Sequence, residues 1–320
     1  MISSYHGLRS LRSNLTSIFI PLIVENARSI ASTSVRDYKN ALNPKTQRLE
    51  RILANRGLGS RSEVSQLLRQ GRIKVKGVIV QCGKNRYPDD IEVILDDTLV
   101  EKVPLLAAYH KPLGVHCTMD DPQNRASLAE LQFKFPFLKS MHPVGRLDSD
   151  TSGLLLFSRH GILTNLLLDP KTRLGRVYEA EVSDNVDHAK LKKMLSAGVK
   201  TSDGVFTAEL LESQVITDAN HAIDVSSKLE VQTSVAKTDA SYIRIRVREG
   251  KYRMVRRILH NAGHSVIKLH RVAYGDIQLC DLPEGQVRAA TEPEILWASK
   301  VTTAMLAKSI RSIRETAGVK

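Results

Sequence analysis

Cysteines and aromatic residues are scarce in this sequence. Only three cysteines occur in 320 residues, Cys82, Cys117 and Cys280, and no two of them form a C-x-x-C pair. This odd, scattered set excludes a disulfide framework and a cysteine-rich zinc site, and it is typical of thiols in a reducing compartment. Aromatic residues make up 5% of the chain, whereas hydrophobic residues make up 42%. We therefore expect a core built mainly from leucine, isoleucine, valine and alanine.

A long apolar run is also missing. The longest, Ile18 to Val24, is short and contains Pro21, whereas a membrane-spanning helix needs about 20 residues. Positive charge, in contrast, is in excess, because 47 Lys and Arg residues and 34 Asp and Glu residues give a net charge of +13. Such an excess favours a polyanionic partner, either nucleic acid or an acidic membrane surface. The charge alone is also compatible with a basic organellar protein that has no such partner.

The first 46 residues are rich in Ser, Thr and Asn, and they hold four arginines but only two acids, Glu25 and Asp37. This composition predicts a transit peptide and an organellar location, either the plastid stroma or the mitochondrial matrix. A plain disordered tail and a secretory signal around Leu15 to Val24 are the alternatives. Without a transit peptide, the protein would be cytoplasmic.

Composition and periodicity divide the rest of the chain into three parts. We expect a small module, a larger domain and a basic tail, with a polar, patternless surface insertion inside the larger domain. The small module covers residues 47–97, the larger domain covers 104–297 and the basic tail covers 298–320. The insertion covers residues 213–237.

Two short helices and a hairpin are predicted in the small module. Apolar residues recur at helical spacing from Leu49 to Leu53, and a second helix begins after Ser60, which with Glu63 forms a capping box. The alternation from Ile73 to Val80, interrupted by a turn glycine, predicts a β-hairpin, and Ile91 to Leu95 predicts a further strand.

Basic residues gather on this module, and acids there are few. Phosphate contacts without base reading suit such a surface, although a solvated face of mixed charge is the alternative. The segments L-x-x-x-G-L-G-S-R-S-E-V at 53–64 and Q-G-R-I-K-V-K-G at 70–77 resemble the S4-type RNA-binding domain. The residues that we expect to contact RNA are Arg56, Arg61, Arg69, Arg72, Lys74 and Lys76.

The segment from His142 to Gly161 carries the strongest chemical signal. An apolar run from Leu154 to Phe157 predicts a strand buried on both faces, and Asp148 lies in the loop before it. A carboxylate held there, kept ionised by Arg146, could act as a nucleophile. An Asp in a turn more often caps backbone amides, and Asp150 is the better candidate for that role. A two-carboxylate glycosidase is disfavoured, because residues at i and i+2 of a strand point apart.

Two further segments add candidate residues. The alternating segment 176–182 predicts a strand with Tyr178 on its inner face, either stacked on a base or merely packed in the core. The segment 249–259 predicts a helix whose first turns carry Arg253, Arg256 and Arg257, and cations at a helix N-terminus require a nearby anion. A metal site at His260 and His264 is disfavoured, because no Glu or Cys accompanies them.

Together these motifs resemble the bacterial ribosomal pseudouridine synthases of the RsuA/RluB group. The resemblance covers residues 47–296 and rests on K-P-L-G at 111–114, G-R-L-D-S-D-T-S-G-L-L-L at 145–156, R-V-Y at 176–178, E-G-K-Y-R-M-V-R-R at 249–257, R-V-A-Y-G at 271–275 and L-P-E-G at 282–285. It implies an α+β fold, in which a mixed, largely antiparallel sheet with flanking helices follows the S4-type α/β module. Arg253 and Met254 stand where His-Gln or Asn-Gln is common, and Arg176 stands where Lys is usual.

The resemblance also implies an activity and its residues. Asp148 would be the catalytic aspartate, Tyr178 would contact a flipped-out uracil, and Arg256 would pair with Asp148, without any metal or cofactor. Asp148 would either attack the sugar at C1′ or remove a sugar proton. We expect a monomer that binds ribosomal RNA or a pre-ribosomal particle and no membrane. The remaining expected RNA contacts are Arg146, Lys251, Arg253 and Arg257.

Two other functions compete with this one. The first is a catalytically inactive RNA-binding factor for ribosome assembly, for which the small module alone would suffice. The second is an RNA or nucleotide hydrolase, which lacks here a second placed carboxylate, a P-loop and metal ligands. The joint presence of Asp148, Tyr178 and Arg256 favours the synthase, because RNA binding does not require them.

Overall fold

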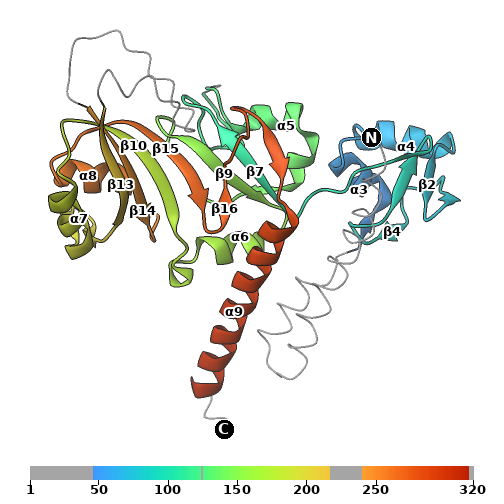
Figure 1. The fold of residues 1–320 in the computed structure, drawn as a ribbon. Coiled ribbons are helices and arrows are strands. Elements are labelled where there is room, and N and C mark those ends of the chain that lie inside the picture. The colour runs from blue at the N-terminus through green and yellow to red at the C-terminus, as the bar shows by residue number, and fades with distance from the viewer. Residues whose placement is uncertain (1–45, 124, 217–239, 317–320) are drawn as a thin grey trace, which may run out of the picture.

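The computed structural model describes residues 46–123, 125–216 and 240–316. The expected leader, apart from Thr46, and most of the expected insertion lie outside these residues, but Ser213 to Ile216 continue a strand. In Figure 1 the N-terminal module lies beside a larger domain built on a single long sheet, and one helix, α9, projects away from that sheet.

The N-terminal module packs two helices against a small antiparallel sheet. Its four-stranded sheet has the order β3-β2-β5-β6, and a separate two-stranded ribbon pairs β1 with β4. The expected hairpin forms between β2 and β3, with Lys76 and Gly77 at positive φ in its turn. The elements are β1 (Gln47–Arg48), α3 (Leu49–Asn55), α4 (Arg61–Arg69), β2 (Ile73–Val75), β3 (Val78–Ile79), β4 (Arg86–Tyr87), β5 (Val93–Leu95) and β6 (Thr98–Leu99).

Local signals placed these helices correctly. The hydroxyl of Ser60 accepts a hydrogen bond from the Glu63 amide at 3.3 Å, and the Glu63 carboxylate accepts one from the Ser60 amide at 2.6 Å. This capping box satisfies two amides at the start of α4. The apolar positions of both helices, with strand residues such as Ile73 and Val93, form one buried core.

The larger domain contains a nine-stranded sheet in the described part of the chain, in the order β13-β14-β10-β15-β9-β7-β17, with β16 beside β15 and β8 beside β9. Only the β15–β9 pair is parallel, so the sheet is mixed and largely antiparallel, as predicted. Its strands are β7 (Leu106–Lys111), β8 (His142–Pro143), β9 (Ser152–Ser158), β10 (Arg176–Ser183), β13 (Glu209–Ile216), β14 (Ala240–Val247), β15 (Val266–Tyr274), β16 (Ile277–Gln278) and β17 (Val287–Ala289).

Helices cover both faces of this sheet. Described helical segments are η1 (Leu128–Glu130), α5 (Leu131–Lys134), η2 (Pro136–Ser140), α6 (Gly161–Leu168), η3 (Pro170–Thr172), α7 (His188–Ala197), α8 (Met254–Asn261) and α9 (Glu292–Thr316). The ribbon of β11 (Val199–Thr201) and β12 (Gly204–Phe206) follows α7.

The apolar run of β9 connects the two cores. Leu155 and Phe157 belong to the core shared with α5, α7 and α8, whereas Leu154 and Leu156 belong to the core shared with α6 and α9. All four side chains are fully buried. The prediction of a strand buried on both faces is therefore confirmed, and β9 rigidly supports the loop that precedes it.

Residues 298–316 of the expected basic tail continue α9. This helix begins at Glu292, and its first turns pack into the core, where Ala298 is buried. Among the described helices, none combines the length and the apolar character that a bilayer span requires.

A polar joint connects the module to the larger domain. The guanidinium of Arg56 donates to the carbonyl oxygens of Asp89 and Ile91 at 2.7 Å each, and burial lowers its pKa to about 10. From the larger domain, Arg159 lies 3.5 Å from the Asp89 carboxylate and donates to the carbonyl of Val103. Asp89 of the module is thus joined to the larger domain by its ion pair with Arg159, and Arg56 holds the segment that carries Asp89.

Gly153 in β9 is required by the packing of the sheet. A Cβ atom at this position would lie 2.3 Å from the carbonyl oxygen of Arg271 in β15, and its φ of +105° disfavours any other residue.

We predict that Gly153→Ala lowers the free energy of unfolding by more than about 3 kcal/mol. Gly114→Ala is the matched control, because Gly114 also has positive φ (+80°) but open space around it. Its cost should be about 1–2 kcal/mol. Urea denaturation of both variants measures the difference, and equal losses would contradict a steric role.

Candidate active site

The loop that carries Asp148 is held by the turn after β7. The amide of Gly114 donates to the Ser149 carbonyl at 2.8 Å, and the amide of Leu147 donates to the sulfur of Cys117 at 3.3 Å. Within the loop, the Asp148 carbonyl accepts from the amide of Thr151 at 3.1 Å. The K-P-L-G turn and the aspartate loop therefore form one interlocked unit.

The carboxylate of Asp148 is accessible and carries little internal bonding. Its side chain is 34% exposed, and the guanidinium of Arg253 lies 3.9 Å from it. Among the described residues no backbone amide donates to this carboxylate, so it does not act as a cap. A carboxylate that remains accessible beside a cation is available for chemistry on a bound ligand.

Asp150, which we expected to cap backbone amides, instead binds two arginines. Arg253 donates to both carboxylate oxygens of Asp150, at 3.0 and 2.7 Å, which is the bidentate geometry of a strong ion pair. Arg256 donates to the Asp150 carbonyl at 2.6 Å, and its Nε lies 3.4 Å from the carboxylate. The side-chain hydrogen bonds from Arg253 hold the pKa of Asp150 below its usual range.

This arrangement corrects the expected pairing of Arg256 with Asp148. The ion pair that Asp148 makes is with Arg253, and Arg256 reaches the same loop through Asp150. Arg256 also donates to the carbonyl of Val266 in β15, so it holds the loop, α8 and β15 together. Burial lowers its pKa, and its position is that of a scaffold for the loop.

Behind the loop, five strands align a row of residues. Lys111 and Arg271 both lie opposite Gly153, in β7 and β15 respectively, and Arg271 lies opposite Tyr178 of β10, which lies opposite Ile245 of β14. Opposed residues share a face of a sheet. Because Gly153 has no side chain, the strands of the two cations pack closely on either side of it, next to the loop.

Both cations of this row are almost completely buried. Lys111 donates from Nζ to the carbonyls of Pro112 and Val115 at 2.8 and 2.9 Å, and burial lowers its pKa. Arg271 donates to the Leu154 carbonyl at 2.7 Å and to the Tyr178 hydroxyl at 3.4 Å. Its Nη2 is buried and has no hydrogen-bond partner among the described residues, which leaves one donor unsatisfied.

Tyr178 faces the core, as predicted. Its ring joins Ala180 and Val182 in the cluster below α8, and 8% of the residue remains exposed. Its hydroxyl receives the hydrogen bond from Arg271, so the ring position is held by packing and the oxygen by a cation. A neighbouring pair repeats the motif, because Arg176 donates to the Tyr274 hydroxyl at 2.9 Å and lies over that ring.

The other residues of this domain that we expected to contact RNA are partly free and partly held in ion pairs. Arg146 and Lys251 are exposed and make no ion pair within the described part of the chain. Arg257, in contrast, points away from the loop and binds Asp203 at 2.8 Å and Ser202 at 2.9 Å. Arg257 therefore braces α8 against the β11–β12 ribbon.

The predicted basic face of the N-terminal module is only partly free. Arg61, Arg69 and Lys76 are exposed and have no ion pair among the described residues. Arg72 instead pairs with Asp96, Lys74 pairs with Asp97 at 2.7 Å, and Arg56 is committed to the polar joint. A further group of arginines, Arg48, Arg51, Arg61 and Arg86, lines a hollow of about 240 Å³ on this module.

No metal cluster is visible in residues 46–123, 125–216 and 240–316. These residues contain no group of three His, Cys, Asp or Glu side chains placed to hold a metal ion. Lys111 and Arg271 were missed as site residues by sequence reasoning, although both lie in the quoted motifs. A charged residue inside an otherwise buried strand is the signal that could have identified them.

Comparison with known proteins gives a consistent result. Residues 106–261 match the family model described as RNA pseudouridylate synthase. A relative named ribosomal large subunit pseudouridine synthase B, from Yersinia pestis, is 33% identical over 76% of this chain and 70% of its own length. A relative of the same name from Bacillus subtilis is 30% identical over 78% of this chain and 94% of its own length. A solved structure titled "Crystal structure of pseudouridylate synthase" is 24% identical, with a TM-score of 0.47, over 78% of this chain and 99% of that chain.

The ion pair between Arg253 and Asp150 gives a titration test. We predict that Arg253→Gln raises the pKa of Asp150 toward its ordinary value of 3.8. Because the folded-state pKa is depressed, the pair stabilises the protein above about pH 4, and this contribution is lost as the pH falls. Asp150 is 45% exposed, so the contribution should not exceed about 1 kcal/mol. Carbon-detected NMR of the aspartate carboxyl groups measures the shift. Arg257→Gln, which removes a pair with Asp203, is the control and should leave Asp150 unchanged.

Proposed function

The chain belongs to the RNA pseudouridylate synthase family, and from that premise we propose that it isomerises a specific uridine of ribosomal RNA to pseudouridine. The observation that carries the proposal is the Asp148 carboxylate, which is partly exposed, lies beside Arg253 and has no capping amide among the described residues. The names of the relatives from Yersinia pestis and Bacillus subtilis support ribosomal RNA as the substrate.

Binding begins with the RNA backbone. The free cations of the N-terminal module, Arg61, Arg69 and Lys76, would hold phosphates of a folded RNA, as expected for an S4-type domain. Closer to the loop, Arg146 and Lys251 are exposed and available for the strand that carries the target uridine. Such contacts position the RNA without reading its sequence.

The target base then has to leave its stack. Flipping costs a few kcal/mol and is cheapest in loops and at weakly paired positions. We assign Arg146 to the space vacated by the base, because this guanidinium is exposed two residues before Asp148. Arg271 Nη2 and the Tyr178 ring would receive the uracil, the first as a hydrogen-bond donor and the second as a stacking surface.

The reaction breaks the N1–C1′ bond and forms a C5–C1′ bond, and the proton lost from C5 is balanced by one gained at N1. Asp148 would either attack C1′ and form a sugar ester or remove a sugar proton to give a glycal. In both routes the uracil carries negative charge when it is detached, and the buried Lys111 and Arg271 stabilise it without reorganisation. Tyr178 would assist the final loss of the C5 proton.

Asp148→Asn separates catalysis from binding. This change removes the reactive carboxylate with almost no change in volume, so pseudouridine formation should fall by at least about a thousandfold. RNA affinity should stay within about threefold of the wild type, because Asp148 lies outside the proposed phosphate contacts. Carbodiimide mapping of ribosomal RNA measures the product, and filter binding measures the affinity.

The matched control is Asp203→Asn, which removes a carboxylate from the other side of α8 and should retain activity. Full turnover by Asp148→Asn would refute the catalytic assignment. A wild-type protein that binds RNA tightly but forms no pseudouridine would indicate an inactive assembly factor, and RNA cleavage would indicate a hydrolase.

We also propose that residues 1–46 direct the protein to an organelle, on the basis of their arginine-rich, acid-poor composition. Fusion of these residues to a fluorescent protein should deliver it to plastids or mitochondria. Replacing the four arginines of this segment with glutamine should leave the fusion in the cytoplasm, because import signals require positive charge. Delivery that persists in the glutamine variant would contradict the proposal.

A further inference from the structure

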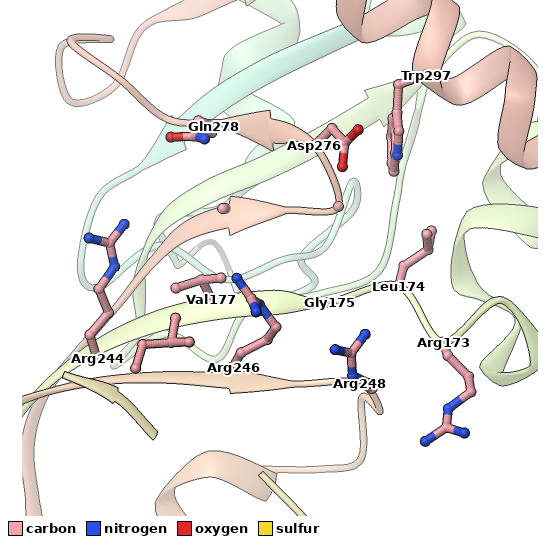
Figure 2. A pocket seen from close by; sticks show the side chains of 13 residues that line it. Arg173, Leu174, Gly175, Val177, Arg244, Arg246, Arg248, Asp276, Gln278 and Trp297 are labelled. Atoms are coloured by element: carbon pink, nitrogen blue, oxygen red, sulfur yellow. The ribbon is translucent and has the colours of Figure 1, made fainter. Parts of the chain in front are cut away.

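A second pocket lies on the face of the sheet opposite to Tyr178. It has a volume of about 370 Å³, within the range of small-ligand sites. In β14 the side chains of Ile243, Ile245 and Val247 enter the core with Tyr178, whereas the alternate residues line the pocket. These alternate residues are Arg244 and Arg246, and Arg248, directly after the strand, continues the row (Figure 2).

The pocket combines an apolar floor, a cationic rim and one large aromatic ring. Val177, Leu211 and Ala273 form the floor. Arg173, from the loop before β10, joins Arg244, Arg246 and Arg248, and Trp297 of α9 stands across from them (Figure 2). Trp297 is the single tryptophan of the sequence.

The packing fixes this ring in place. A Cβ atom on Gly275 would lie 2.0 Å from the Trp297 indole, so the tight turn between β15 and β16 accommodates the ring only because residue 275 is glycine. On the other side, a Cβ on Gly175 would lie 3.1 Å from the Arg246 side chain. The indole and the guanidinium therefore each lie against a glycine of the pocket.

The positive charge of the rim is incompletely neutralised. Arg246 and Arg248 share one carboxylate oxygen of Glu209, at 3.1 and 3.7 Å. Arg244 lies 3.9 Å from Glu179, whose pKa is raised by burial, and its Nε is buried without a hydrogen-bond partner among the described residues.

Two more charges complete the rim. Arg173 is exposed and has no ion pair within residues 46–123, 125–216 and 240–316. Asp276 is the single carboxylate among the described lining residues. The rim therefore offers donors to an anionic ligand, and guanidinium groups bind phosphate oxygens bidentately.

We propose that this pocket binds a nucleotide of single-stranded RNA, with the base stacked on Trp297 and the phosphate held by Arg173 and Arg248. Aromatic stacking combined with a cationic groove is the usual chemistry of single-strand recognition. The choice of RNA over other polyanions rests on the proposed function, and the pocket lies outside the site of that reaction.

The chain connects the pocket to the active site directly. Arg248 directly follows β14, and Arg253, five residues later, binds Asp150 and lies near Asp148. Five residues span at most about 18 Å, and Lys251 lies between them. One RNA molecule can therefore occupy the active site and continue around the end of β14 into the pocket.

The fluorescence of Trp297 reports on this pocket alone, because no other tryptophan exists. Titration of the full chain with a short single-stranded oligouridylate should quench the Trp297 emission to saturation. The double variant Arg173→Gln/Arg248→Gln should weaken this binding about tenfold or more. The slope of log affinity against log salt should become shallower by about 0.7, because one phosphate is no longer neutralised.

The double variant Lys192→Gln/Lys193→Gln on α7 is the matched control, because both side chains are exposed and the change of charge is the same. It should quench like the wild type. Thermal unfolding of both double variants at the wild-type temperature shows that the fold is retained.

Three outcomes decide whether the pocket binds RNA and whether the proposed function stands. If oligouridylate leaves Trp297 unchanged while the enzyme still forms pseudouridine, the second site is wrong and the proposed function stands. If polyglutamate quenches as well as oligouridylate, the pocket binds acidic protein and the assignment to RNA is overturned. If quenching depends on Arg173 and Arg248 in a chain that forms no pseudouridine, the RNA pocket is supported and the proposed function fails.

Discussion

At Gly153 the backbones of β9 and β15 approach so closely that one added carbon atom would overlap the carbonyl of Arg271. This contact aligns the only parallel strand pair of the described sheet with the loop that carries Asp148. Because β7 is in register on the other side, Lys111 and Arg271 meet across the same glycine. The positions of both buried cations thus depend on a residue that has no side chain.

Burial strengthens the electrostatic interaction of Lys111 and Arg271 with nearby charges. A charge held away from water acts strongly on a nearby charge, but it is stable only when its donors are satisfied. Carbonyl oxygens of Pro112, Val115 and Leu154 and the hydroxyl of Tyr178 accept hydrogen bonds from them, and one nitrogen of Arg271 is left over. The arrangement is preorganised for an anion formed during the proposed reaction rather than for one that is permanently present.

Local patterns in the sequence predicted the fold well. The capping box of α4 and the buried run of β9 involve residues close in sequence, so their geometry follows from spacing alone. The mixed sheet came from the family resemblance rather than from periodicity, and the structure agrees with it. The position of Asp148 in an open loop followed from the same short-range signals.

Pairings between distant segments were the part that sequence reasoning missed. Asp150 and Arg253 are 103 residues apart, and an Asp followed by turn formers looks like a cap until the partner is known. Arg72 and Lys74 meet Asp96 and Asp97 from the turn between β5 and β6, which neutralises two of the six basic residues expected to contact RNA.

The joint between the two domains has a consequence for the choice of target. Asp89 lies between two guanidinium groups, one from each side, and a Cβ on Gly57 would lie 3.2 Å from Pro136 of the larger domain. A module docked in this way stays at a fixed distance from the loop that carries Asp148. The enzyme would then recognise a uridine by its separation from a fold in the RNA, so a change in that spacing would matter more than a change in the neighbouring bases.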